Sequence, residues 1–173
     1  AQVTEMEYMF KQAIVGYPVF NGDVSKWDTA QVENMAEMFY QATSFNGDLS
    51  KWDTASVTIM YNMFKQAIVF NGDVSKWDTA KVADMWNMFE QATAFNRDVS
   101  KWDTASVTGM DQIFFEASKF NQDLSKWDTA LVEDGDCTDF ALNSSCPIDN
   151  NPNNTANTGC LLYTSDAADE SVC

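Results

Sequence analysis

The sequence repeats with a period of 25 residues, and this period limits the fold more than any other feature. One tryptophan and, seven residues before it, one phenylalanine mark each of five consecutive copies. The tryptophans are Trp27, Trp52, Trp77, Trp102 and Trp127. A partial copy over residues 3–19 precedes them and carries four additional residues at 16–19. Because a copy this short cannot bury its own apolar face, we expect the copies to stack into a solenoid.

The two halves of a copy carry different patterns. In the second half of the second copy, apolar residues are spaced i, i+3, i+6, i+7 and i+10 from Val57, which is typical of one helical face. Asp53 or Thr54 is suited to cap this helix at its N-terminus. The first half carries a turn sequence at 46–48 and then a short extended stretch over 49–52. The pattern predicts an α/β solenoid of strand-turn-helix units with a short-stranded parallel sheet.

The composition excludes several classes of function. The formal net charge is -16, with 26 acidic residues against 10 basic ones, whereas nucleic-acid binding needs clustered Lys and Arg, so we expect no nucleic-acid partner. The chain has no histidine, which removes histidine-based catalytic sets and zinc sites. No stretch approaches the ~18 apolar residues of a membrane span. Because regular columns offer no unique pocket, we expect neither an enzyme nor a cofactor.

The repeated string F-N-x-D-[VL]-S-x-W-D-[TS]-x-x-V-x-x-M-x-x-M-F resembles the BspA-like surface-protein repeat. That family is related to leucine-rich repeats and has no assigned biochemical role. The resemblance covers residues 3–142 and implies a leucine-rich-repeat-like solenoid in a secreted or cell-surface protein of bacteria or protists, used in adhesion or protein binding. It implies no catalytic residue. The last copy departs from the string after Val132, as expected of a capping coil.

In a solenoid, the residues at one position of successive copies form a column. We expect the Phe, Val/Leu, Met and Ala columns to form the core. We also expect the Trp column to be buried, because an exposed strip of five Trp side chains would promote aggregation; the alternative is a stacking surface for sugar rings. The asparagine column is expected to bond the turn backbone as an internal ladder. It consists of Asn21, Asn46, Asn71, Asn96 and Asn121.

Two further columns are candidates for ion or crystal binding. One aspartate column offers oxygen ligands that suit Ca²⁺, although turn and helix-cap hydrogen bonds also explain it. Its members are Asp23, Asp48, Asp73, Asp98 and Asp123. A threonine column at strand spacing is the type of surface that ice-binding solenoids use, although threonine at a helix start is usually a cap. Its members are Thr29, Thr54, Thr79, Thr104 and Thr129.

The residues that differ between copies predict a binding face. Trp86 occupies a position where other copies have Ala36, Tyr61 and Asp111, and such variation is typical of a solvent-facing helix position. We expect Tyr61 and Trp86 to share an exposed helix face with a second variable column. That column is Gln31, Ser56, Lys81, Ser106 and Leu131. The side chains of this face would determine which partner is bound, although the residue type at exposed positions also changes without selection.

The composition changes after Leu142. Residues 143–159 are Asn-rich and predict a linker or cap with two glycosylation sequons, at Asn143 and Asn153. Cys137 and Cys146 are candidates for a disulfide that closes the terminal coil, which would fit an oxidising compartment. Residues 160–170 resemble a translated sequencing adapter, which predicts that the tail at 160–173 is not native and lies outside the 1–142 solenoid.

These observations predict a non-catalytic secreted or cell-surface module that binds a protein or a surface glycan. A passive spacer within a larger surface protein is the first alternative. A calcium- or ice-binding ladder is the second.

Overall fold

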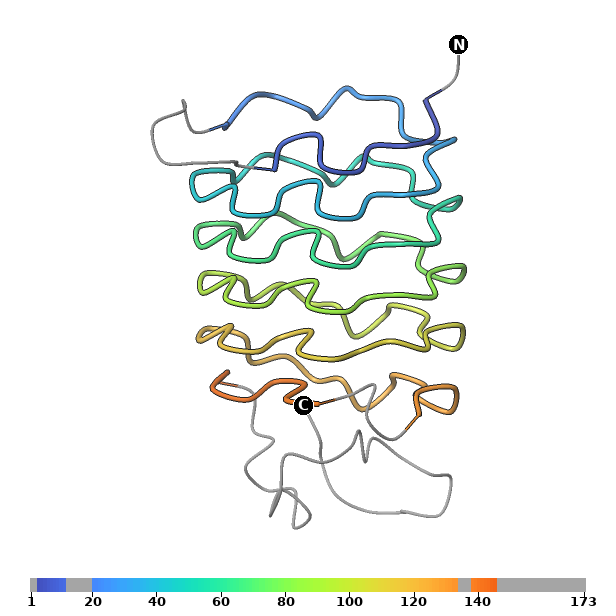
Figure 1. Cartoon of the computed structure of the whole chain (residues 1–173), viewed down its shortest axis with the longest axis vertical. Helices are drawn as coiled ribbons and strands as arrows, with labels where there is room; N and C mark the ends of the chain where they lie inside the picture. The colour runs from blue at the N-terminus through green and yellow to red at the C-terminus, as the bar shows by residue number, and fades with distance from the viewer. Residues whose placement is uncertain (1–2, 12–19, 134–137, 146–173) are drawn as a thin grey trace.

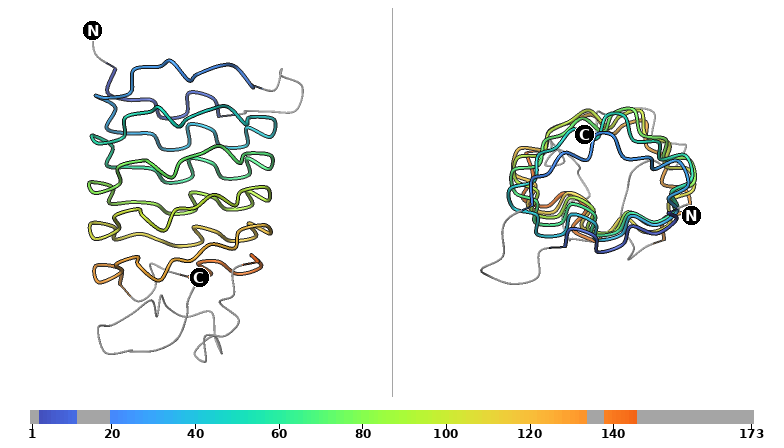
Figure 2. Two further views of the ribbon diagram at one scale, coloured as in Figure 1. Left: turned by 180° about the vertical axis from the view of Figure 1, so that it is seen from behind. Right: turned by 90° about the horizontal axis from the view of Figure 1, so that it is seen from above.

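The computed structural model describes residues 3–11, 20–133 and 138–145, and these form a stack of rungs (Figure 1). Each 25-residue copy makes one rung, and successive rungs run in the same direction around a common axis. Viewed along this axis, the rungs superimpose as a flattened ring (Figure 2). The chain is therefore a solenoid, as the period predicts, and each described rung contacts its neighbours in the stack.

The second half of each rung is not helical, and this part of the prediction is wrong. The described residues contain no helix and no strand longer than a single bridge. The predicted short-stranded sheet is replaced by one line of isolated parallel bridges that crosses the rungs. The bridges pair Glu5 with Asn34, Asn34 with Ile59, Ile59 with Asp84, and Asp84 with Gly109.

Successive β-turns take the place of the predicted helix. In one rung the amide of Met63 donates to the carbonyl of Met60, and the amide of Ala67 donates to the carbonyl of Phe64. The third residues of these two turns, Asn62 and Gln66, have φ values of 54° and 60°. A left-handed third residue is typical of a type II turn and cannot continue a right-handed helix. The same pair of left-handed residues recurs at Glu37 and Gln41, Asn87 and Gln91, and Gln112 and Glu116.

Backbone hydrogen bonds join each rung to the next along this half. The amides at 35, 37, 39 and 41 donate to the carbonyls at 59, 61, 63 and 65, each 24 residues further on, at 2.8–3.0 Å. Alternate amides thus point to the next rung, as in a parallel ladder. The amides between them close turns within their own rung. The left-handed residues keep the segment flat enough for both sets of bonds to form.

Aromatic side chains fill the space inside the rungs. Where one copy passes into the next, the rings of Phe64 and Phe70 stack with centroids 4.0 Å apart. From rung to rung, Phe64 stacks on Phe89 at 5.4 Å, and Trp77 stacks on Trp102 at 6.3 Å. These Phe side chains are fully buried. The prediction of a Phe, Val/Leu, Met and Ala core is confirmed.

Four tryptophans of the Trp column are buried as predicted, with Trp27 partly buried at the end of the stack, and each of the four indoles has a polar partner. The Nε1–H groups of Trp52, Trp77, Trp102 and Trp127 donate to backbone carbonyls of the preceding rung at 3.0–3.2 Å. Trp102, for example, is 3% exposed and donates to Val74. A buried N–H left without an acceptor would cost about 1–3 kcal/mol, so this bond fixes the spacing of the rungs. The alternative of an exposed sugar-stacking Trp strip is wrong.

The asparagine column forms the expected internal ladder. The side-chain oxygen of each of the first four asparagines accepts from the backbone amide of the asparagine one rung further on, as between Asn46 and Asn71 at 2.8 Å. Three further bonds of the same kind continue it.

No helix within the described ranges is long and apolar enough to cross a membrane.

Candidate binding face

One side of the solenoid is built by the half of each rung that carries the bridges and turns. We call it the ladder face and define it by the outward residues of 33–41 and of the equivalent segments 58–66, 83–91 and 108–116. Residues 4–11 and 138–143 extend it at the two ends. In the first full rung, residues 35, 38 and 39 point inward and are buried. The outward positions are 33, 34, 37, 40 and 41 with their equivalents in other rungs, together with position 36, where Ala36 is buried but its equivalent Trp86 is exposed.

The ladder face is chemically the most variable surface of the described chain. Its central column differs in every rung, and its members are Glu7, Ala36, Tyr61, Trp86, Asp111 and Thr138. The opposite half of the rung repeats almost unchanged, with the same Asp, Ser, Lys, Trp, Asp and Thr in five copies. Each rung therefore places a different side chain on one face while its core and its other half stay constant.

Near the N-terminal end, side chains on the ladder face bridge from rung to rung. The Tyr61 hydroxyl donates to Glu7 Oε1 at 2.9 Å, two rungs away. The Tyr61 side chain thus crosses the rung of Ala36, which is fully buried. Lys11 is ion-paired with Glu37, and its ammonium group lies 4.8 Å from the ring centres of Tyr8 and Tyr40. The bond to Glu37 raises the pKa of Lys11, so this lysine stays charged.

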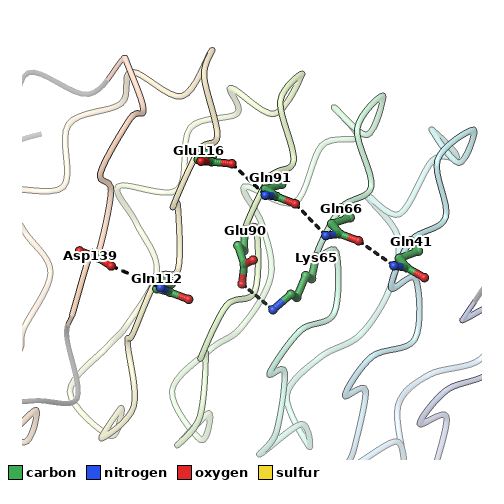
Figure 3. A network of polar contacts seen from close by, with 8 residues as sticks. All are labelled: Gln41, Lys65, Gln66, Glu90, Gln91, Gln112, Glu116 and Asp139. Atoms are coloured by element: carbon green, nitrogen blue, oxygen red, sulfur yellow. Dashed lines mark hydrogen bonds and ion pairs between the residues drawn. The ribbon is translucent and has the colours of Figure 1, made fainter.

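A ladder of glutamine side chains runs along one margin of the ladder face (Figure 3). Gln41 Nε2 donates to Gln66 Oε1 and Gln66 Nε2 donates to Gln91 Oε1, both at 2.7 Å. Gln91 then donates to Glu116 Oε2 at 2.8 Å. Beside it, Lys65 Nζ lies 2.6 Å from Glu90 Oε2, although Glu90 is largely buried. Sequence reasoning missed this ladder, but the recurrence of Gln, Gln, Gln and Glu every 25 residues is a signal that could have found it.

The middle of the ladder face combines an exposed indole with two carboxylates. Trp86 is 47% exposed. The backbone amide of Trp86 donates to Asp84 Oδ1 at 2.9 Å. Asp111 occupies the position of Trp86 in the next rung, and its Oδ1 accepts from the amide of Thr138 at 2.8 Å. Burial, with a further contribution from the charge of Asp111, raises the pKa of Asp84.

The predicted binding residues fall into two separate places. Tyr61 and Trp86 lie in the central column of the ladder face, as predicted together, but on a turn-built segment instead of a helix. The second predicted column lies five residues earlier, next to the turn that the Val32 amide closes on the Thr29 carbonyl. In that column Ser56 and Ser106 donate to carbonyls of the preceding rung at 2.8 Å, and Lys81 and Gln31 are exposed.

The aspartates of the candidate calcium column form hydrogen bonds within turns. Each of its aspartates accepts a hydrogen bond at Oδ1 from the backbone amide two residues later, as Asp48 does from Ser50 at 2.9 Å. Hydrogen bonds from the serine side chain and from the serine amide lower the pKa of all five carboxyls. Within the ranges that the structure describes, no three acidic or cysteine side chains gather as a metal site would require. The column thus acts as a set of Asx turns.

The threonine column is not the exposed ladder that ice binding requires, and that prediction is wrong. Thr54 is 2% exposed, and its hydroxyl donates to the Asp78 carbonyl of the next rung at 2.8 Å. Thr29, Thr79 and Thr104 are buried and bonded in the same way. The threonines therefore join rungs from the inside. They do not cap helices.

The predictions for the C-terminal segment are mostly beyond the described ranges. Cys137, Cys146, Asn153 and the tail at 160–173 all lie outside them. Asn143 lies inside, is exposed and has a φ of 62°. Its side chain is thus accessible in the last described turn.

Comparison with known families places the repeat. The model of a family described as "Mycoplasma protein of unknown function, DUF285" matches residues 1–85 and 60–138. The chain belongs to this family. No curated protein and no solved structure matches the chain. The family description assigns no biochemical role.

Proposed function

We propose that this DUF285 chain is a non-catalytic module of a secreted or cell-surface protein, and that it binds a protein or glycan partner through the ladder face. The observation that carries this proposal is the separation of constant and variable positions. The core and one half of each rung repeat, whereas the central column of the ladder face changes from Glu7 through Tyr61 and Trp86 to Asp111. A recognition surface needs a different side chain at each point of contact, and this is the half that supplies it.

The exposure of individual side chains supports the same assignment. Trp86 is 47% exposed on the ladder face, whereas the five repeated tryptophans lie against or within the core. Aromatic anchors are enriched at the centres of protein interfaces, where they add contact area with little loss of side-chain entropy. The resemblance to BspA-like surface repeats supports the extracellular location and the adhesive role. The absence of histidine supports a function without catalysis.

A binding screen with two matched variants tests the proposal. The full chain is immobilised and screened against extracellular protein and glycan panels. A double variant, Tyr61→Ala with Trp86→Ala, changes the ladder face, and the control Lys76→Ala with Lys101→Ala changes two exposed positions of the repeated half. We expect the first variant to lose binding and the second to keep it. Binding that survives the first variant would refute the ladder face as the site, and a chain that binds no panel member would favour the spacer alternative.

A further inference from the structure

We propose that the partner of the ladder face is a basic protein segment, and that one of its Lys or Arg side chains sits over Trp86 between Asp84 and Asp111. This inference rests on the proposed binding function and adds the chemistry of the partner. It follows from three features of the described residues: the exposed indole, the two carboxylates beside it, and the charge of the whole face.

The backbone holds the three side chains in fixed relation. Asp84 lies two residues before Trp86 and accepts the Trp86 amide at 2.9 Å. The amide of Asn87 donates to the Asp111 carbonyl at 2.8 Å, which places the next rung alongside Trp86. Neighbouring strands in a ladder lie about 4.8 Å apart, so Trp86 and Asp111 are side-by-side residues. Each carboxylate accepts a backbone amide at Oδ1, so the proposal assigns Oδ2 of Asp84 and of Asp111 to the partner.

Gly109 lies under the Asp84 carboxylate in the neighbouring rung. It pairs with Asp84 in the last of the parallel bridges, at the position where the other rungs have Glu5, Asn34 and Ile59. A Cβ atom at this position would lie 3.2 Å from Asp84 Oδ1. Because glycine has no side chain, the Asp84 carboxylate can pack closely over the backbone of the next rung at this point. The rung that lacks a side chain at the bridge is thus the one beside the exposed indole.

The charge of the ladder face favours a positively charged partner. Its only two basic side chains within the described ranges are Lys11 and Lys65, and each is ion-paired with a glutamate of the same face. The face also carries several acids outside these pairs. They include Glu5, Glu33, Asp84, Asp111 and Glu116. A basic segment therefore meets carboxylates and no unpaired base, whereas an acidic partner would be repelled.

The indole strengthens this preference at one point. The face of a tryptophan ring attracts a cation, with about 0.5–1 kcal/mol at exposed sites and about 2 kcal/mol or more when water is excluded. Burial is the main cause of the raised pKa of Asp84, and the charge of Asp111 raises it further because two nearby carboxylates repel each other. A guanidinium or ammonium group between them removes that repulsion. A neutral saccharide would stack on Trp86 without using either charge.

Short peptides containing Arg or Lys, together with forms in which these residues are replaced by Gln, test the inference on the full chain. We expect the basic peptides to bind, the Gln forms to bind at least tenfold more weakly, and the affinity to fall as salt is added. Asp84→Asn and Asp111→Asn keep the Oδ1 acceptor and remove one charge each. Each should weaken the basic peptide several-fold, as should Trp86→Ala. Asp98→Asn is the matched control, because Asp98 accepts the Ser100 amide at 2.9 Å in the same turn geometry on the repeated half of the rung.

The outcomes separate this inference from the proposed function. Equal binding of basic and Gln peptides, or capture of a neutral glycan that Asp84→Asn leaves unchanged, would overturn the basic partner while the ladder face remained a binding site. Equal losses from Asp84→Asn and Asp98→Asn would show only a response to net charge, and would also overturn it. If Trp86→Ala and both ladder-face Asn variants left binding intact, the ladder face would not be the binding site. That outcome would refute both proposals.

Discussion

The left-handed backbone at Asn62 allows a test of the fold in which alanine and glycine change their usual order. Asn62 has a φ of 54°, and its side-chain Oδ1 is buried without a hydrogen-bond partner. The variants Asn62→Ala and Asn62→Gly both remove this side-chain amide. The difference in stability between them therefore reports mainly on the backbone conformation.

The expected difference follows from two opposing contributions. A residue with a Cβ atom loses about 1–2 kcal/mol in the left-handed region. Glycine loses about 0.4–1 kcal/mol through the greater freedom of the unfolded chain. We expect Asn62→Gly to be more stable than Asn62→Ala by about 1 kcal/mol. In the helix that the sequence pattern predicts, Ala would instead be the more stable by about 1 kcal/mol.

Urea unfolding of the two variants measures this difference. Ala83→Gly is the control, since Ala83 is exposed in the same half of a rung and lies outside the set of left-handed residues. That substitution should destabilise the chain. If Asn62→Ala equalled or exceeded Asn62→Gly in stability, the account of this segment as a run of turns would be refuted.

Three further predictions concern the core, the turn carboxylates and the stack. Trp102→Phe should lower the free energy of unfolding in urea by about 3 kcal/mol, because it leaves the Val74 carbonyl without its donor and creates a void. Trp86→Ala should change that free energy by less than about 0.5 kcal/mol. Similar losses in the two variants would contradict the difference in burial between Trp102 and Trp86. The pKa values of the five calcium-candidate aspartates are lower in the folded chain than in the unfolded chain, so their stabilising contribution is present above about pH 4 and is lost as the pH falls through the folded values. The urea midpoint should therefore fall less on acidification in Asp98→Asn than in the unmodified chain. If the pH dependence of the midpoint were unchanged, the Ser100 hydrogen bond to Asp98 would not be a cause of it. Deleting residues 70–94, one full copy, should leave a shorter chain that unfolds cooperatively, and loss of cooperative unfolding would contradict nearest-neighbour stacking.

The sequence predicts the core of this protein well because core columns depend only on the period. Phe64, Met60 and Trp102 recur in register, and stacking rungs must bury them together. The asparagine ladder follows for the same reason. Asn46 lies one period before Asn71, and a side-chain oxygen can reach the backbone amide of the next rung.

The helix was predicted wrongly because two kinds of local structure share one apolar spacing. Consecutive four-residue turns over 60–63 and 64–67 place inward residues three or four positions apart, as an α-helix does. The distinction lies at Asn62 and Gln66, which adopt positive φ. Their residue types permit that conformation but do not require it, so hydrophobic periodicity cannot identify it.

The candidate site was predicted in part. The difference between Tyr61, Trp86 and their equivalents identifies the variable column without any structure. The neighbours that give Trp86 its chemistry depend on rung-to-rung register, which places Asp111 beside it and Gly109 beside Asp84. The threonine column was misassigned because Thr54 donates to a carbonyl of another rung, and residues within one copy do not reveal that partner.

The most direct test of the account is the partner of the Asn62 amide, because the ladder that exposes the variable half depends on bonds of this kind. The structure places this amide 2.8 Å from the Trp86 carbonyl in the next rung. A through-hydrogen-bond scalar coupling between the Asn62 nitrogen and the Trp86 carbonyl carbon should be detected by NMR in the labelled full chain. A helix would instead pair this amide with Thr58, four residues earlier. Coupling to the Thr58 carbonyl, and none to Trp86, would contradict both the ladder and the binding face built on it.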